Sequence, residues 1–221
     1  MSLTLYYHPL ASFCHKVLIA LYENGVAFDA RIIDLGAEQD RAELASMWPF
    51  CKFPVLRDSA RNRDVPESSV IIEYLDRFFP GKSPLLPVDF DAALQVRLWD
   101  RIFDNYVHAP MQDIVMDHIR GAKADMGGAR SSIQTAYCLL DKQLASSLWA
   151  AGANFSLADC AAAPALFYAH TLEPFPEQLG YLRAYFDRLM ARPSVQRVLA
   201  EARPYFPLYP FHAAIPARFL S

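Results

Sequence analysis

The apolar positions at the start of the chain predict a strand, a loop and a helix. Residues 4–7 are a short run of strand-favouring residues. After the loop, apolar residues recur at helical spacing until Asn24 and Gly25 end the pattern; they are Cys14, Val17, Leu18 and Leu21. The stretch YYHPLASFCHKVLIAL therefore brings Tyr7 and Ser12 close to the start of a helix.

The next part of the chain continues this alternation of strands and helices. Residues 28–35 contain the β-branched pair Ile32 and Ile33, residues 38–48 read as a second helix, and FPVLRD is a short strand. Residues 58–66 are rich in polar residues and predict a hairpin turn. A third helix is indicated by Val70, Ile71, Tyr74, Leu75 and Phe78, and Pro80–Gly81 ends it. The order β-α-β-α-β-β-α within residues 1–80 is typical of a small α/β domain.

The rest of the chain is predicted to be helical. The segment PGKSPLLP makes residues 81–88 the best linker, so residues 89–221 form an all-helical second domain. Residues 89 to about 118 are predicted as one long amphipathic helix, kinked at Pro110, because Leu94, Leu98, Ile102 and Tyr106 recur every four residues. The tail from Arg203, with four prolines and five aromatic residues, is expected to pack as extended chain.

The motif FSLADC predicts how one of these helices begins. Ser156 stands three residues before Asp159, which is a variant of the capping box, and Phe155 is placed as a hydrophobic staple. A structural role is favoured over a catalytic one for both polar residues, because such a cap stabilises a helix start by about 1 kcal/mol.

Composition and charge exclude several classes of function. Hydrophobic residues make up 53% of the 221 residues, enough for a substantial core. The net charge of −3 and the interspersed charges leave no basic stripe for nucleic acid. The start of the chain does not resemble a leader, and the apolar tract between Asp159 and Glu173 is too short to cross a bilayer, so we expect a cytoplasmic protein that contacts no membrane. The four cysteines are scattered and the histidines lack metal-binding spacing, so no metal is expected.

Three motifs in order resemble the cytosolic glutathione transferase family. They are WPFCKFPVL at residues 48–56, where the family pattern is Asn-Pro-x-Gly-Lys-x-Pro-Val-Leu, then Glu67-Ser68 leading a helix, then the Ser156–Asp159 cap. Together they cover most of the chain, and the N-terminal region resembles the serine-type, bacterial-like members and the zeta, tau and theta classes. The resemblance implies a thioredoxin-like domain followed by an all-helical domain, glutathione as co-substrate, and a homodimer.

The resemblance also implies which residues bind glutathione. The matching proline of the family is cis, which implies a cis Phe53–Pro54 bond and a free Phe53 backbone with which an extended tripeptide can pair as an added strand. Ser68 at a helix start would hold the γ-glutamyl carboxylate and Glu67 the neighbouring ammonium. Lys52 would reach the glycyl carboxylate, and Phe13 would lean on the peptide.

The residue that stabilises the glutathione thiolate is the open question. Lowering a thiol pKa by about 2 units requires about 2.7 kcal/mol, which one hydroxyl at a helix start can supply. Ser12, placed just before the first helical turn, ranks first, Tyr7 at the strand end second and Cys14 third. Alignment on Cys14 puts Ala11 at the family's usual catalytic position, so Ser12 would act from one residue further along.

The predicted function is a glutathione S-transferase that directs the thiolate of glutathione at an electrophilic, mostly apolar small molecule. The pocket for that molecule is assigned to Leu10, Tyr106, Met111 and Ile114. One alternative is a glutathione-dependent disulfide reductase or peroxidase that uses Cys14 or Cys51, the latter standing where the family has glycine. The other is a non-catalytic ligand-binding member of the fold, which the missing hydroxyl at Ala11 favours.

Overall fold

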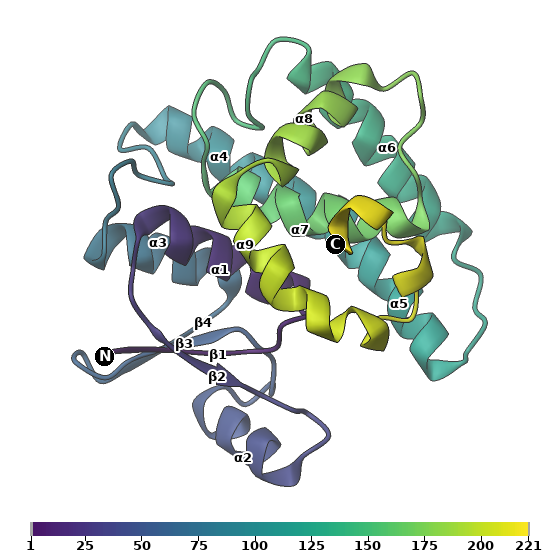
Figure 1. Cartoon of the computed structure of the whole chain (residues 1–221). Coiled ribbons are helices and arrows are strands. Elements are labelled where there is room, and N and C mark those ends of the chain that lie inside the picture. Colours follow the sequence, from purple (N-terminus) through teal and green to yellow (C-terminus); the bar gives the residue numbers. More distant parts are fainter. Residues whose placement is uncertain (1, 221) are drawn as a thin grey trace. The chain divides into compact units, whose positions relative to one another are not determined.

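The computed structural model describes residues 2–220 and consists of two compact units, divided between Leu86 and Pro87. The first unit contains a sheet with helices, and the second is built of helices (Figure 1). The division falls inside the segment predicted as a linker, residues 81–88. The precise limits of the two domains stay a prediction.

The first unit has the predicted element order. It consists of β1 (Leu3–Tyr7), α1 (Ser12–Asn24), β2 (Asp29–Ile32), α2 (Glu38–Met47), β3 (Val55–Asp58), β4 (Arg63–Pro66) and α3 (Ser68–Phe78). The turn predicted over residues 58–66 was too long, because β4 occupies its second half. Asp64, one of the polar residues that suggested a turn, forms a cross-strand pair with Arg57 instead, with Arg57 Nε donating to Asp64 Oδ1 over 2.8 Å.

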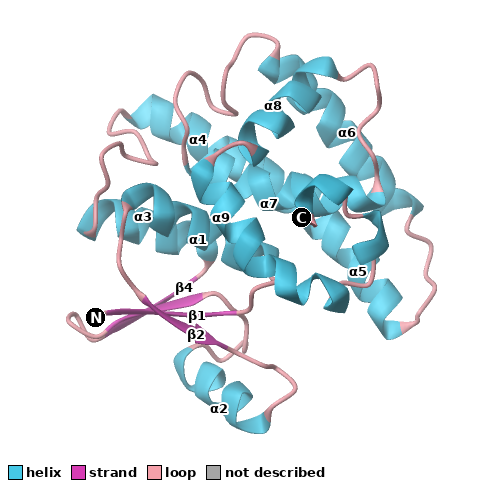
Figure 2. Ribbon diagram, in the orientation of Figure 1, coloured by secondary structure: helices cyan, strands magenta, loops and turns pink. Residues whose placement is uncertain are grey.

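The sheet has the strand order β2-β1-β3-β4, with β1 parallel to β2 and β3 antiparallel to both of its neighbours. Helices α1 and α3 cover one face and α2 covers the other (Figure 2). Because side chains alternate along a strand, Tyr6 and Val55 pack with Leu44 of α2, whereas Leu5 and Leu56 are buried on the opposite side. This is the thioredoxin-like arrangement that the resemblance implied.

The second unit is organised around one buried helix. It consists of α4 (Phe90–Ile102), a π-helical segment η1 (Phe103–His108), α5 (Ala109–Arg120), α6 (Gly127–Leu144), α7 (Leu157–Leu172), α8 (Gly180–Met190) and α9 (Pro193–Ala202). Helix α7 is buried along almost its whole length and packs against α4, η1, α5 and α8. An apolar sequence on all sides of α7 explains this central position.

The capping box predicted for the start of α7 is confirmed. The Asp159 carboxylate accepts from the Ser156 N–H over 2.9 Å and from the Tyr185 hydroxyl over 2.6 Å. Asp159 Oδ1 also accepts from the Ala150 N–H. Phe155 packs edge-on against the Trp149 ring, with centroids 5.2 Å apart. These contacts support the structural role that the sequence favoured for Ser156 and Asp159.

The long helix predicted over residues 89–118 is present but interrupted. Residues Phe103–His108 are π-helical, and the Ala109 N–H donates to the carbonyl of Asp104, five residues back. The interruption precedes Pro110 because a proline lacks an N–H and its ring crowds the carbonyl four residues earlier, a conflict that a wider turn relieves. The apolar stripe that predicted the helix is only partly buried: Ile102 is buried, whereas Leu94 and Leu98 are each 49% exposed.

The prediction of an extended tail was wrong. After α9 the chain forms three short 3₁₀ turns, η2 (Arg203–Leu208), η3 (His212–Ala214) and η4 (Ala217–Phe219). Proline fixes φ near the value that such turns require, so a proline-rich segment suits a 3₁₀ turn as well as extended chain. Among residues 2–220, no helix is long and apolar enough to cross a membrane.

Candidate functional site

The register of the sheet gathers three loops of the first unit at one end. Tyr6 pairs with Val55, so the end of β1 lies beside the start of β3, and Val55 pairs with Pro66 at the end of β4. The loop after β1, the Phe53–Pro54 turn before β3 and the start of α3 therefore lie at the same end of the strands. The sequence-predicted residues for glutathione and its thiol come from these three segments.

The loop after β1 leads directly into α1. Ala11 is the N-cap, with an extended backbone, and its carbonyl accepts from the N–H groups of Cys14 and His15. Ser12 is the first residue of the helix rather than the residue before the first turn, and its side chain is largely buried. Phe13 follows it in the first turn and is half-buried. The first turn contains no acidic residue, so no side chain of this turn neutralises the positive end of the helix dipole.

The other two candidates for the thiol partner differ sharply in burial. Tyr7 is the last residue of β1 and half-buried, and its carbonyl accepts from the Ile33 N–H. Cys14 is completely buried, as its place in the apolar stripe predicted. Burial raises the pKa of the Cys14 thiol well above its usual range, and a backbone hydrogen bond at His8 lowers it only in part. Cys14 therefore carries a protonated, inert thiol at neutral pH.

The Phe53–Pro54 bond is cis, as the resemblance implied. Among the described residues, neither the N–H nor the C=O of Phe53 has a hydrogen-bond partner. Phe53 is half-buried and lies just before the start of β3, where it is in no strand, so these two groups can pair with an extended peptide. Lys52, the preceding residue, is exposed.

His8, which no sequence pattern singled out, contacts both the loop after β1 and Phe53. Its ring stacks on the Phe53 ring, and its Nδ1 accepts from the Leu10 N–H over 3.2 Å. An Nδ1 that accepts carries no proton, so the neutral imidazole has its hydrogen on Nε2. Burial lowers the pKa of His8, and the nearby Asp34 raises it by a smaller amount. A histidine beside a loop proline was the only sequence signal, and it was too common to be informative.

The start of α3 is a helix N-terminus with an unusual first residue. Glu67 is the N-cap, with a φ of 69°, and it is exposed. Ser68 is the first helical residue, not the cap, and is buried. An L-residue rarely adopts a positive φ unless its surroundings impose it, and such residues concentrate at functional sites. The free N–H groups of a first helical turn make this end suitable for an anion.

A buried lysine reinforces the positive character of that helix end. Lys16 of α1 is 1% exposed, and its Nζ donates to Ser69 Oγ over 2.9 Å. Ser69 is the second residue of α3. The signal in the sequence was a lysine inside an otherwise apolar helical run. A buried ammonium needs a hydrogen-bond partner, and Ser69 supplies it.

Cys51 stands where the family pattern has a glycine, and its backbone conformation is one that favours glycine. Its φ is 51°, in the left-handed region, where glycine is favoured because it has no Cβ. The Cys51 Sγ–H donates to the carbonyl of Arg41, and the residue is partly buried. This side chain is therefore anchored toward α2.

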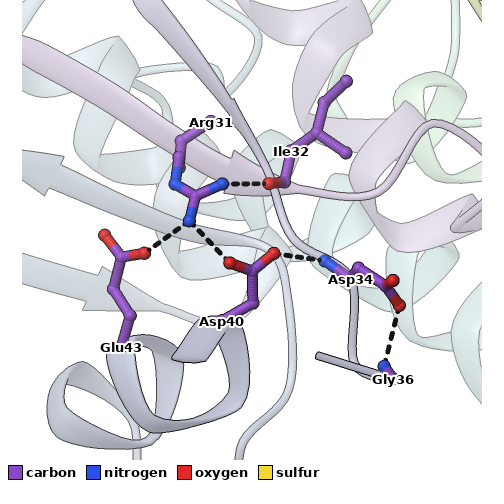
Figure 3. Close-up of polar contacts among 6 residues, drawn as sticks. All are labelled: Arg31, Ile32, Asp34, Gly36, Asp40 and Glu43. Atoms are coloured by element: carbon purple, nitrogen blue, oxygen red, sulfur yellow. Dashed lines mark hydrogen bonds and ion pairs between the residues drawn. The ribbon is translucent and has the colours of Figure 1, made fainter. Parts of the chain in front are cut away.

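An exposed ion-pair network fixes the loop that carries Asp34 (Figure 3). Arg31 lies between Asp40 and Glu43, with Nη2 donating to them over 2.7 and 2.8 Å. Asp40 Oδ2 also accepts from the Asp34 N–H, and this bond and Arg31 lower the pKa of Asp40. The network holds the end of β2 to α2, and it therefore fixes the position of Asp34, whose charge raises the pKa of His8.

The predicted residues of the electrophile pocket are divided between the units. Leu10 is half-buried in the first unit. In the second, Met111 and Ile114 are buried in its interior, and Tyr106 is 56% exposed. Their grouping into one pocket stays a prediction. Among residues 2–220, no group of three or more histidine, cysteine, aspartate or glutamate side chains is placed to hold a metal ion.

Comparison with known proteins assigns both units to one family. Residues 11–77 match the model of the glutathione S-transferase N-terminal domain, and residues 97–188 match that of the C-terminal domain. A relative from Coxiella burnetii, a "Stringent starvation protein A homolog", is 34% identical over 166 residues, which are 75% of each chain. The chain belongs to the glutathione S-transferase family.

Other members of the glutathione S-transferase family match over nearly the whole chain. Glutathione S-transferase F10 of Arabidopsis thaliana is 28% identical over 91% of this chain and 98% of its own. A delta-class glutathione transferase of Nilaparvata lugens has a TM-score of 0.84 and 21% identity, covering 97% of this chain and 100% of its own. A glutathione S-transferase of Methylobacillus flagellatus, solved with glutathione bound, has a TM-score of 0.77 and 23% identity, covering 89% and 98%. These two structures confirm the fold.

Proposed function

We propose that this glutathione S-transferase family member is an active transferase that uses glutathione as co-substrate. The observation that carries the proposal is the unpaired N–H and C=O of Phe53, at the same end of the strands as the start of α3. An extended peptide that pairs with Phe53 would have one end near Ser68 and Glu67. Glutathione carries a carboxylate and an ammonium at its γ-glutamyl end, which fit that helix start and the Glu67 carboxylate.

The same geometry gives each remaining residue a role in binding. The γ-glutamyl carboxylate would accept from the first N–H groups of α3 and the Ser68 hydroxyl, with the Lys16 ammonium adding favourable charge through Ser69. Lys52 would reach the glycyl carboxylate, and Phe13 would contact the peptide. The cysteinyl side chain would then point to the start of α1.

We propose Ser12 as the group that stabilises the thiolate. It occupies the first turn of α1, where the helix dipole favours negative charge. The thiol proton would pass to solvent, and the thiolate sulfur would form a bond to the electrophilic carbon of an apolar small molecule such as an aryl halide, whose carbon–halogen bond breaks and releases the halide with its electron pair. Tyr7 is the second candidate. Burial weighs against Cys14.

The experiment that tests the assignment is the pH titration of glutathione-thiolate absorbance in the wild type, Ser12→Ala and Tyr7→Phe. We expect Ser12→Ala to raise the pKa of the bound thiol by about 1 to 2 units, the loss of one hydrogen bond to a charged acceptor. Tyr7→Phe serves as the matched control and should leave it unchanged. An unchanged pKa in Ser12→Ala would contradict the assignment, and the absence of glutathione binding by the wild type would contradict the function.

A second candidate function is ligand binding without catalysis. Ala11 stands at the N-cap, where the serine-type pattern places its hydroxyl, and three of the similar proteins carry the name "Stringent starvation protein A homolog" rather than transferase. Calorimetry that shows glutathione binding, together with no conjugation of a reactive aryl halide, would favour this candidate.

We also propose that the chain is a cytoplasmic homodimer. Helix α4 presents Phe90, Leu94 and Leu98 on one exposed face at helical spacing, an apolar patch that a second copy can cover. Leu94→Glu would place a charge in that face and should convert a dimer to a monomer in light-scattering measurements. All four cysteines are free thiols, which is consistent with a reducing compartment.

A further inference from the structure

The segment between α3 and α4 returns to the helix that it leaves. Asp76 lies in the last turn of α3, and its Oδ2 accepts from the Leu86 N–H over 2.7 Å. Its Oδ1 accepts from Asn24 Nδ2, at the end of α1, over 3.3 Å. One carboxylate therefore joins the ends of two helices to the connector, residues 79–86, whose last residue is also the last of the first unit.

The connector fits closely against the first unit at two further points. The Leu85 side chain is buried. Gly81 lies so near to α1 that a Cβ on it would stand 2.7 Å from the Asn24 Cα, a backbone atom that cannot move aside without moving the helix. Between these two points residues 82–84 are exposed. A segment that is held at a few points with exposed chain between them is of the kind that opens locally.

The polar part of this contact is imperfect. A carboxylate only accepts hydrogen bonds, so Asn24 faces it with its NH₂ group, and Asn24 Oδ1 is left buried without a partner among residues 2–220. Burial raises the pKa of Asp76, the bonds from Leu86 and Asn24 lower it only in part, and Glu73 raises it further. The desolvated charge and the unpaired oxygen both cost free energy, so neutral groups in the same geometry would hold the connector more tightly.

Helices α1 and α3 pack against each other and are joined at both ends. The Lys16–Ser69 bond lies near their starts, where glutathione is proposed to bind, and the Asn24–Asp76 bond joins their far ends. A peptide that contacts both starts selects one position of α1 against α3. If the same position closes the contact at the far ends, linkage requires that binding and closure favour each other.

We propose that Asp76 and Asn24 form a weak clasp that lets the connector open and close, and that glutathione binding closes the clasp. The second part rests on the proposed function. Opening releases residues 79–86 from the ends of α1 and α3, so the clasp determines how much free chain joins the two units.

Amide hydrogen exchange at Leu86, followed by NMR in the full chain, measures the opening of the clasp. The Leu18 amide, in the buried middle of α1, reports global unfolding in the same spectra. We expect Leu86 to exchange faster than Leu18, because the clasp opens without unfolding the helices. Saturation with S-hexylglutathione should slow the exchange of Leu86 by about fivefold or more, the lower end of the coupling between linked sites.

Three substitutions should move the clasp in different directions. Asp76→Asn keeps an acceptor for Leu86, removes the buried charge and offers an NH₂ group to the oxygen of Asn24 once that amide turns over, so Leu86 should exchange more slowly than in the wild type. Asp76→Ala removes both bonds and should speed the exchange about tenfold or more. Gly81→Ala pushes the connector away from Asn24 and should also speed the exchange, with the carboxylate intact.

Asp113→Asn is the matched control. It removes an exposed carboxylate from α5, in the second unit, and should leave the exchange of Leu86 as it is in the wild type.

The weak clasp is contradicted if Leu86 exchanges as fast in Asp76→Asn as in Asp76→Ala, or if folded Gly81→Ala exchanges like the wild type. The coupling alone is contradicted if calorimetry shows that S-hexylglutathione binds while the exchange of Leu86 stays the same. Failure of S-hexylglutathione to bind would contradict the proposed function, and the coupling with it, whereas the ligand-free variants would still decide the clasp.

Discussion

The ring of His8 stacks on the ring of Phe53, with centroids 6.0 Å apart and planes inclined by 21°. The same imidazole accepts the Leu10 N–H, so it connects the loop before α1 to the residue whose backbone we propose to pair with glutathione. Protonation of Nδ1 would convert that acceptor into a donor and break the bond to Leu10.

We expect the affinity for S-hexylglutathione, which has no free thiol, to fall as the pH drops below the ordinary His8 pKa of 6.5. The folded-state pKa of His8 is lowered by burial, so the neutral form and its contacts are fully present above 6.5 and are lost as the pH falls through the lowered pKa. Calorimetric titrations between about pH 5 and 8 measure this.

Two substitutions at His8 separate its contacts. His8→Asn keeps an acceptor for Leu10 and does not titrate, so the step in affinity should disappear. His8→Phe keeps a ring against Phe53 and loses the acceptor, so it should bind weakly at every pH. An unchanged pH profile in His8→Asn would show that another group titrates, and His15, which contacts the Pro9 carbonyl, would be examined next.

Tyr74→Phe should destabilise the first unit by about 1.5 to 3 kcal/mol, because it removes a hydrogen bond to a buried carboxylate. Asp58 is fully buried, and its Oδ2 accepts from the Tyr74 hydroxyl over 2.8 Å. Arg61 donates to the same oxygen but is half exposed, so Arg61→Ala should cost less than about 1 kcal/mol. Urea unfolding measures both, with exposed Tyr181→Phe as the control.

The same carboxylate predicts a pH dependence of stability. Burial alone would raise the pKa of Asp58, but the bonds from Tyr74 and Arg61 outweigh it and lower the pKa below 3.8. Its contribution to stability is therefore complete above 3.8 and is lost as the pH falls through the lowered pKa. In Tyr74→Phe the loss should begin at a higher pH, and an identical acid-unfolding curve would contradict this.

The cysteines should react with iodoacetamide in the order of their exposure. Cys138 is exposed, Cys51 is partly buried, and Cys14 and Cys160 are buried. Because a protonated, buried thiol is inert, we expect no modification of Cys14 in the folded protein at pH 8, and complete modification in urea. Peptide mass spectrometry reads each site. Rapid native labelling of Cys14 would revive the disulfide-reductase alternative.

Asp159→Ala should destabilise the second unit by about 2 to 5 kcal/mol, since it leaves the Tyr185 hydroxyl and the Ser156 and Ala150 N–H groups without an acceptor. Ser156→Ala removes a single bond to the same carboxylate and should cost about 1 kcal/mol. Thermal unfolding compares the two. Equal effects of the two substitutions would mean that the cap, and not the Tyr185 contact, accounts for the stabilisation.

The sequence predicted those features that depend on neighbouring residues. The buried position of Cys14 followed from its helical stripe, and the Ser156–Asp159 box needed only four consecutive residues. The stack of His8 on Phe53 joins residues 45 positions apart, so no local pattern could reveal it. Leu94 and Leu98 show another limit: an apolar stripe looks the same in the sequence whether its residues are buried or exposed.

The π-helical turn at Phe103–His108 lies between α4 and α5 and holds one residue more than regular α-helical turns would, so it changes which residues of α5 lie on the same face as those of α4. Four buried residues follow one another at intervals of four, Trp99, Phe103, Val107 and Met111. In an uninterrupted α-helix each such step overshoots a full turn by about 40°, so three steps would carry Met111 about 120° away from Trp99. The wider turn absorbs this drift. Deleting one residue from the segment would remove about 100° of rotation, so it would restore a regular helix and still leave Met111 within about 20° of the face of Trp99.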